Sequence, residues 1–139
     1  MKRRPFIALF AVATAAAPAL ARQSSGKQRV IFQVSDADPA KWSLALDNAR
    51  NVQADLGKEN VEIEIVAYGP GLAMLKLESP VADRLAQALD SHVDLIACEN
   101  TMHTGKLTRD DMYGGIGYVQ AGVSHIVRRQ LEGWAYIRP

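Results

Sequence analysis

The sequence predicts an α/β protein: a three-layer α/β/α domain in which helices cover both faces of a mainly parallel sheet. Apolar, β-branched segments alternate along the chain with segments of helical periodicity. The apolar segments are nearly continuous, as expected for strands that are buried on both faces. With 48% hydrophobic and 22% charged residues, the composition is typical of a globular domain and excludes collagen-like, coiled-coil and disordered chains.

Residues 1–21 have the features of a secretory signal peptide. Lys2, Arg3 and Arg4 precede an apolar run of about fifteen residues that ends in the small-x-small pattern Ala-Leu-Ala. An uncleaved membrane anchor is the alternative, but the run is shorter than the roughly 20 residues that span a bilayer. We therefore expect a periplasmic or secreted protein with no membrane attachment after cleavage.

The remaining chain is predicted to be a polar, flexible tail at residues 22–28 and one domain at residues 29–139. Without residues 1–21, 13 basic residues face 15 acidic residues. This mildly acidic balance gives no reason to expect binding to nucleic acid. The single cysteine excludes an internal disulfide framework.

The first strand is predicted at residues 29–34, which are apolar and β-branched. Asp38 follows as a helix N-cap, and Pro39 fits the first helical position. The helix they begin has apolar residues near the 3.6-residue period and ends at Gly57, a C-cap candidate.

The second strand is predicted at residues 61–68 and ends in a Gly-Pro-Gly turn. A short apolar helical turn follows at residues 72–77, and a helix begins at Ser79-Pro80. The third strand, residues 93–98, brings the chain to Cys98.

The last part of the chain predicts one long helix and a final strand. Thr108 and Asp111 have the spacing of a capping box, and a short strand near residues 117–119 follows a glycine-rich loop. Residues 121–131 form the predicted helix, with one apolar face and a solvated Arg128-Arg129 pair, and residues 134–138 form the last strand. The apolar face consists of Val123, Ile126, Val127 and Leu131.

Cys98 is the candidate functional residue because it lies where a buried strand meets a loop. Loops that leave the carboxyl ends of parallel strands converge at one edge of a sheet, where ligands bind. Asn100 and Thr101 are candidate caps for a following helix, whose N-terminus would lower the pKa of the thiol, while the charge of Glu99 acts in the opposite direction. A buried structural cysteine is the alternative, because free cysteine is among the most buried residue types.

Metal and nucleotide sites have weaker support. Cys98, Met102 and His103 supply soft ligands of the kind copper prefers, but their spacing is not a specific signature. The three histidines are scattered along the chain. The glycines near residue 115 fit neither a dinucleotide-binding motif nor a P-loop. We therefore predict no metal and no cofactor.

Five segments carry a resemblance to a known family: Val-Ile-Phe-Gln-Val-Ser-Asp, Val-Glu-Ile-Glu-Ile-Val-Ala-Tyr-Gly-Pro-Gly, Ala-Cys-Glu-Asn-Thr-Met, Gly-Tyr-Val-x-Ala-Gly-Val and Glu-Gly-Trp-Ala-Tyr-Ile-Arg-Pro. Together they resemble the DsrE/DsrF-like family of sulfur-relay proteins, in particular its small exported branch. The resemblance covers residues 29–139. It implies a flavodoxin-like α/β/α domain with about five strands, assembled into homotrimers or homohexamers.

The resemblance also implies that Cys98 accepts sulfur as a persulfide and passes it on. Better-understood relatives act in the cytoplasm, and their cysteine loop often ends in Arg-Gly, where this chain has Thr104-Gly105 followed by Lys106. A cationic group that would attract anionic sulfur compounds is therefore shifted or lost. Lys106 is our candidate for this role, and Asn100 and Thr101 are candidates to hold the terminal sulfur.

The function predicted from the sequence is that of a periplasmic sulfur carrier that exchanges sulfur with donor and acceptor proteins or small sulfane-sulfur compounds. Cys98 is its sulfur-accepting thiol, and Glu99, Asn100, Thr101 and Lys106 are its supporting residues. Two alternatives remain open. One is a non-catalytic oligomeric binding module with a buried structural cysteine, and the other is a thiol redox sensor.

Overall fold

The structure, a computed structural model, describes residues 26–139. The predicted signal peptide and the first residues of the predicted tail lie outside the described residues. Of the tail, Gln28 already belongs to the first strand. Among residues 26–139, no helix is both long and apolar enough to cross a membrane.

Within residues 26–139, five strands alternate with helices. The strands are β1 (Gln28–Val34), β2 (Val61–Ala67), β3 (Val93–Cys98), β4 (Gly117–Val119) and β5 (Ala135–Ile137). The α-helices are α1 (Pro39–Leu56), α2 (Ala82–Asp90), α3 (Glu99–Thr104) and α4 (Gly122–Leu131). Three short 3₁₀ helices are η1 (Lys58–Asn60), η2 (Gly69–Leu75) and η3 (Arg109–Asp111).

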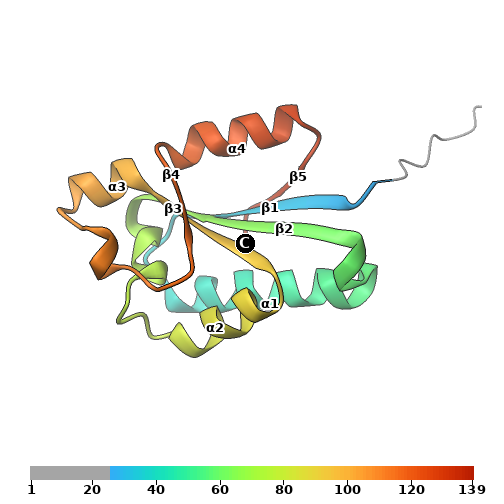
Figure 1. The fold of residues 1–139 in the computed structure, drawn as a ribbon, viewed down its shortest axis with the longest axis horizontal. Coiled ribbons are helices and arrows are strands. Elements are labelled where there is room, and N and C mark those ends of the chain that lie inside the picture. The colour runs from blue at the N-terminus through green and yellow to red at the C-terminus, as the bar shows by residue number, and fades with distance from the viewer. Residues whose placement is uncertain (1–25) are drawn as a thin grey trace, which may run out of the picture.

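The strands form one sheet in the order β4-β3-β2-β1-β5, and every neighbouring pair is parallel. The chain steps from β1 through β2 and β3 to β4 in one direction and then crosses back to β5. Parallel crossovers are right-handed, so connections that run in opposite directions lie on opposite faces of the sheet. Accordingly, α1 and α2 cover one face and α4 covers the other (Figure 1). The predicted three-layer parallel architecture is confirmed.

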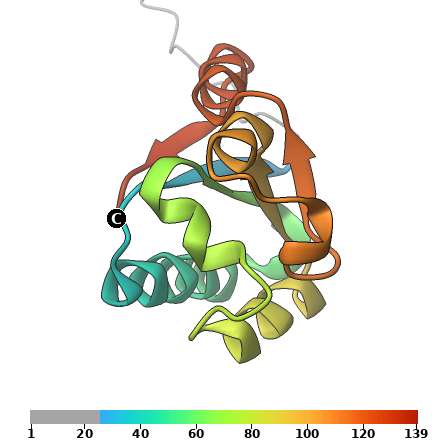
Figure 2. The ribbon, with the colours of Figure 1, turned by 90° about the vertical axis from the view of Figure 1, so that its left-hand side faces the viewer.

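The carboxyl ends of the central strands lie side by side. In the strand register, Val34 pairs with Ala67, and Ala67 pairs with Ala97. The chain leaves these ends through η2 and α3, which lie together at one end of the molecule (Figure 2). This is the edge at which the sequence predicts the functional site.

Local signals in the sequence correctly predict the boundaries of several elements. The side chain of Asp38 accepts a hydrogen bond from the backbone N–H of Ala40 at 2.9 Å, and α1 ends at Gly57, whose φ is 91°. The capping box of Thr108 and Asp111 is present at η3. Each signal depends on a few consecutive residues, which is why the sequence alone reveals it.

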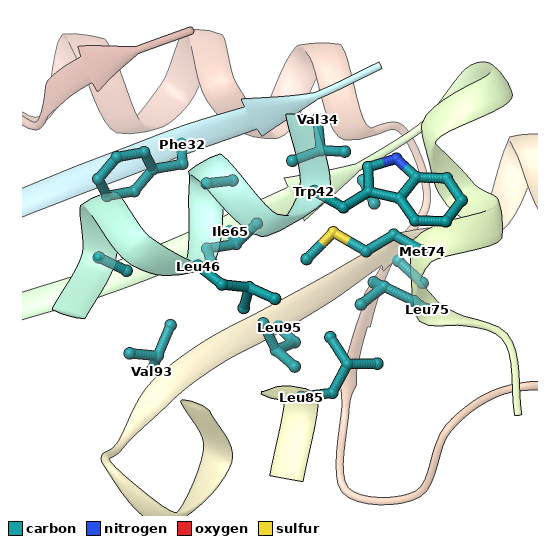
Figure 3. Close-up of a cluster of buried hydrophobic side chains, with 14 of the residues drawn as sticks. Phe32, Val34, Trp42, Leu46, Ile65, Met74, Leu75, Leu85, Val93 and Leu95 are labelled. Atoms are coloured by element: carbon teal, nitrogen blue, oxygen red, sulfur yellow. The ribbon is translucent and has the colours of Figure 1, made fainter. Parts of the chain in front are cut away.

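The main core lies between the sheet and the pair α1 and α2 (Figure 3). Phe32 and Ile65 project from the central strands, and Leu85 of α2 and Met74 of η2 close the layer; all four are fully buried. The second face has a smaller apolar cluster, Ile31, Val66, Ile96, Ile126 and Trp134. This smaller cluster gives α4 a mixed contact with the sheet, part apolar and part charged.

The structure divides the predicted apolar face of α4. Of its four residues only Ile126 is buried, whereas Val123, Val127 and Leu131 are 53%, 50% and 84% exposed. The helix instead turns His125 toward the sheet, because the carboxylate of Glu64 on β2 is buried there and contacts it. Pairing a buried charge takes precedence over burying three more aliphatic side chains.

Candidate functional site

Cys98 is the last residue of β3 and the N-cap residue of α3. Its side chain is on the α4 face of the sheet, where its sulfur meets the first residue of α4. Only 5% of the residue is exposed. The predicted position at the end of a strand is therefore confirmed, and the thiol is buried in the single chain.

Backbone groups from a distant part of the chain surround the sulfur. The N–H of Gly122 donates a hydrogen bond to Cys98 Sγ at 3.3 Å, and the thiol contacts the carbonyl oxygen of Gln120 at 3.7 Å. The same carbonyl oxygen accepts the N–H of Asn100 at 2.9 Å. Cys98 is thus held between α3 and the segment that leads from β4 into α4.

A side chain at Gly122 would crowd the close approach of α4 to the sheet. A Cβ atom there would lie 3.2 Å from Cβ of Tyr68 and 3.3 Å from Cγ1 of Val66. Both contacts are tighter than nearly all contacts that Cβ atoms make in proteins. Glycine therefore lets the helix start lie directly on β2, with its N–H group aimed at the sulfur.

The hydroxyl of Thr101, in the first turn of α3, is a second group that lowers the pKa of the Cys98 thiol. The hydroxyl oxygen accepts the backbone N–H of Gly69 at 2.9 Å. Because this bond occupies a lone pair, the hydroxyl proton is free to be donated to Cys98. The first residue of η2 therefore fixes the donor that faces the thiol.

These contacts favour the thiolate form of Cys98. Burial by itself raises the pKa of the thiol, but hydrogen bonds from the Thr101 side chain and from the N–H of Gly122 oppose it. The backbone N–H groups of Thr101 and Asn100 act in the same sense, and the net effect is a pKa below the ordinary value for cysteine. A lowered pKa is what a nucleophilic thiol requires at neutral pH.

The other predicted supporting residues lie farther from the sulfur. Glu99 is exposed and its carboxylate lies 3.6 Å from the guanidinium of Arg109. Lys106 is exposed just beyond α3, with a φ of 54° and its N–H bonded to the carbonyl oxygen of His103. Within residues 26–139, no hydrogen bond or ion pair joins either side chain to Cys98. Of the predicted supporting residues, Thr101 acts on the thiol through its side chain and backbone N–H, and Asn100 through its backbone N–H alone.

The soft ligands considered for copper are separated by their environments. Met102 is buried in the main core beneath the sheet, whereas His103 is exposed. In the described part of the chain, no three His, Cys, Asp or Glu side chains form a group that would hold a metal ion. The geometry therefore gives no support to a copper site at Cys98.

Cys98 does not line either of two cavities in the described part of the chain. One, of about 360 Å³, lies between α1 and α2 near the beginning of β3, at the opposite end of that strand from Cys98. The other, of about 370 Å³, is an open groove along α3 that includes Asn100 and His103. Cys98 directly precedes residues that line this groove, but its own thiol is buried in the packed layer. Because it is buried, the thiol suits reaction with a small group.

Sequence reasoning missed the residues that reach Cys98 from elsewhere in the chain. These residues are Gly122, Gln120 and Gly69, whose side chains give no signal in the sequence. Their backbone N–H and carbonyl groups make the contacts with Cys98 and Thr101. The prediction of a solvated Arg128-Arg129 pair is wrong for Arg129, which is partly buried. Its guanidinium instead bonds both carboxylate oxygens of Glu64, with the shortest contact at 2.6 Å, and this bond raises the pKa of Arg129.

Comparison with solved structures supports the same fold. Protein MTH1491 from Methanobacterium thermoautotrophicum, of unknown function, is 41% identical and has a TM-score of 0.77, over 81% of this chain and 100% of the other. BT1422 from Bacteroides thetaiotaomicron, also of unknown function, has a TM-score of 0.64 at 11% identity, over 81% of this chain and 95% of the other. The ychN protein from E. coli has a TM-score of 0.65 at 12% identity, over 81% of this chain and 99% of the other.

These likenesses differ in what they establish. At 11% and 12% identity, BT1422 and ychN share the fold alone. No curated protein matches the chain. The model of the DsrE/DsrF-like family matches residues 28–139, which include every strand of the sheet and Cys98. The chain therefore belongs to the DsrE/DsrF-like family.

Proposed function

We propose that the protein is a sulfur carrier that holds sulfur as a persulfide on Cys98. Membership of the DsrE/DsrF-like family suggests a sulfur-relay role. The observation that carries the proposal is the set of donors around Cys98, above all the Gly122 N–H at 3.3 Å and the Thr101 hydroxyl. These groups stabilise a thiolate, which is the attacking form in sulfur exchange.

Sulfur transfer at Cys98 proceeds as two exchange steps. The Cys98 thiolate attacks the outer sulfur of a donor persulfide, a new S–S bond forms, and the donor thiolate leaves with the electron pair of the broken bond. An acceptor thiolate then attacks the outer sulfur on Cys98, and the Cys98 thiolate is released. Each step forms and breaks one S–S bond, so the relay needs no external oxidant or reductant.

Mass spectrometry of the intact protein tests this proposal. After incubation with polysulfide, the wild-type chain is expected to gain the mass of one sulfur atom, and a reducing thiol is expected to remove it. Cys98→Ser is the matched control, because the chain has no other cysteine. If a small control thiol is persulfidated and Cys98 stays unmodified, the carrier proposal is wrong.

A non-catalytic module with a structural cysteine is the second candidate, and the 5% exposure of Cys98 favours it. Titration of the native protein with a small and a bulky thiol reagent separates the two candidates. A carrier reacts with the small reagent in the folded state at a rate that follows the thiolate population. A structural cysteine reacts only on unfolding.

We also propose that the protein is a homo-oligomer. Helix α4 carries an exposed apolar row that consists of Val123, Val127 and Leu131. These residues are spaced four apart, so they lie on one side of the helix. Covering such a row with a second copy would remove apolar surface from water. Light scattering of the wild type is expected to give a trimer or hexamer, and Val127→Glu a smaller species. A wild-type monomer would contradict the proposal.

Export is the remaining part of the proposal. It is based on residues 1–21, in which three basic residues precede an apolar run and a small-x-small pattern. Fractionation of cells that express the full chain, with N-terminal sequencing of the product, tests it. The expected product begins near residue 22 and leaves the cytoplasm. An unprocessed chain in the cytoplasm would contradict export and leave the chemistry of Cys98 unaffected.

A further inference from the structure

Helix α4 supplies a hydrogen-bond donor to Cys98, so the position of this helix decides whether the donor is in place. The N–H of Gly122, its first residue, lies 3.3 Å from Cys98 Sγ. Within the single chain, Val123 and Val127 on the outer face of the helix are exposed and do not hold it against the sheet. The contacts on its inner side must therefore fix its position.

Glu64 provides the charged part of these contacts, beside the apolar packing of Ile126. It lies on the central strand β2, is 3% exposed, and its side chain contacts α4 on the side that faces the sheet. Its Oε2 lies 2.7 Å from His125 Nε2, and its Oε1 accepts Arg129 Nη2 at 2.6 Å and Nε at 3.0 Å. One carboxylate is thus bonded to two side chains, four residues apart, on the same side of one helix.

Two anchors on a single helix restrict both its rotation and its movement along the sheet. A buried carboxylate is costly unless its oxygens are paired, so the native arrangement resists any displacement of α4 that would break these bonds. His125 lies only three residues after Gly122, within the first turn of the helix. A shift at His125 is therefore transmitted to the donor at Cys98.

We propose that Glu64 is a positioning residue for the sulfur site: by holding His125 and Arg129, it keeps the N–H of Gly122 on the Cys98 sulfur. This inference rests on the proposed role of Cys98 and adds a residue on another strand to its machinery. Glu64 does not contact the sulfur itself. It acts through the rigid start of α4.

The surroundings of Glu64 supply further charged groups and a matched control. Asp94, its register partner on β3, has a pKa that is raised by burial and by the charge of Glu64. Arg29 of β1 donates to the backbone carbonyl oxygen of Glu132. The carboxylate of Glu132 accepts Arg129 Nη1 at 2.9 Å but does not contact His125. Glu132→Gln therefore removes one acidic partner of Arg129 and leaves the Glu64 anchor intact.

The experiment compares Glu64→Gln, His125→Ala and Glu132→Gln with the wild type. The pH titration of Cys98 is followed by the ultraviolet absorbance of the thiolate, and the amide resonance of Gly122 is followed by NMR. Loss of one hydrogen bond to a charged group is expected to raise the measured pKa of Cys98 by about one pH unit. In Glu64→Gln and His125→Ala, the measured pKa of Cys98 should rise in this way. The chemical shift of the Gly122 amide should then change less when Cys98 ionises. In Glu132→Gln, Cys98 should titrate as in the wild type.

The proposal fails if folded Glu64→Gln and His125→Ala both titrate like the wild type, or if Glu132→Gln shifts as far as they do. If Glu64→Gln does not fold, the titration of His125→Ala alone tests the proposal. In His125→Ala the carboxylate of Glu64 keeps its bonds to Arg129, so the buried charge stays paired. Sulfur loading of the wild type is measured separately. Wild type that loads sulfur while the titrations stay unchanged contradicts the role of Glu64 alone, and wild type that does not load contradicts the carrier function.

Discussion

The backbone N–H of Gly122 donates to the sulfur of Cys98 at 3.3 Å, across a separation of 24 residues in the sequence. The contact exists because β4 pairs with β3, and the chain turns directly from β4 into α4. It joins the end of one strand to the beginning of the helix on the second face of the sheet. The chemistry of the only cysteine therefore depends on how the last third of the chain folds back over the sheet.

Replacing Thr101 by Val is expected to raise the pKa of Cys98. The substitution removes the hydroxyl that donates to the sulfur and keeps the shape of the side chain. A hydrogen bond to a charged group corresponds to about one pH unit in the pKa of the thiol. Thr104→Val is the control, because that hydroxyl bonds the carbonyl oxygen of Asn100 on the exposed side of α3. The rate of alkylation of the thiol as a function of pH measures both, and equal profiles would contradict the role of Thr101.

Replacing Gly71 by Ala is expected to destabilise the fold strongly. A Cβ atom at Gly71 would lie 2.6 Å from the carbonyl carbon of Val34 and 2.8 Å from the nitrogen of Ser35, and both are backbone atoms that cannot rotate away. Overpacking of this kind costs about 1–3 kcal/mol or more of unfolding free energy. At Gly114 a Cβ atom meets nothing within 4 Å. Denaturant unfolding should therefore distinguish Gly71→Ala from Gly114→Ala, and equal midpoints would refute the steric argument.

Replacing Asp94 by Asn is expected to stabilise the protein at neutral pH. Partial desolvation at the edge of the α4 layer, together with the charge of Glu64, raises the pKa of Asp94. The carboxyl group of Asp94 therefore keeps its proton to a higher pH in the folded state than in the unfolded state. As the pH rises from the unfolded-state pKa to the folded-state pKa of Asp94, the unfolding free energy falls. Asp94→Asn is therefore expected to increase the unfolding free energy at pH 7. This increase should vanish below the pKa that Asp94 has in the unfolded state.

The size of this gain is limited by solvent, because Asp94 is exposed at its strand position. We expect less than about 1 kcal/mol in unfolding free energy. Asp110→Asn, at an exposed position on η3, is the control. Thermal unfolding at acidic and neutral pH measures the difference between the variants. A gain that is the same at both pH values would show that charge is not its cause.

Replacing Leu85 by Ala is expected to lower the unfolding free energy by about 2–5 kcal/mol, because it leaves a cavity in the core. Leu85 has no exposed surface and lies between α2 and the sheet (Figure 3). Leu77, which is 58% exposed, provides the same substitution without a cavity, and Leu77→Ala should change stability by less than about 0.5 kcal/mol. Urea titration of both variants checks the difference. Similar midpoints would place Leu85 outside the cooperative core.

The sequence predicted the features that depend on neighbouring residues. The apolar segments at β1, β2 and β3, the cap at Asp38 and the helix end at Gly57 each follow from a short local pattern, and the structure confirms them. The position of Cys98 at the end of a strand follows in the same way. The backbone conformation of such segments is restricted by their own side chains, so little else is needed to predict them.

Tertiary structure decided how α4 meets the sheet. By its own sequence the helix has an apolar face, yet Val127 and Leu131 are exposed and His125 is buried. The reason is Glu64, 61 residues earlier in the chain, whose buried carboxylate needs partners that only the packed helix provides.

Tertiary structure also decided the surroundings of Cys98. Local sequence placed the thiol beside Asn100 and Thr101, and both are at the site. The donor from Gly122 and the acceptor from Gln120 arrive through the pairing of β4 with β3. Backbone groups are the same in every residue, so their approach to a particular sulfur is set by the path of the chain and not by which residues carry them.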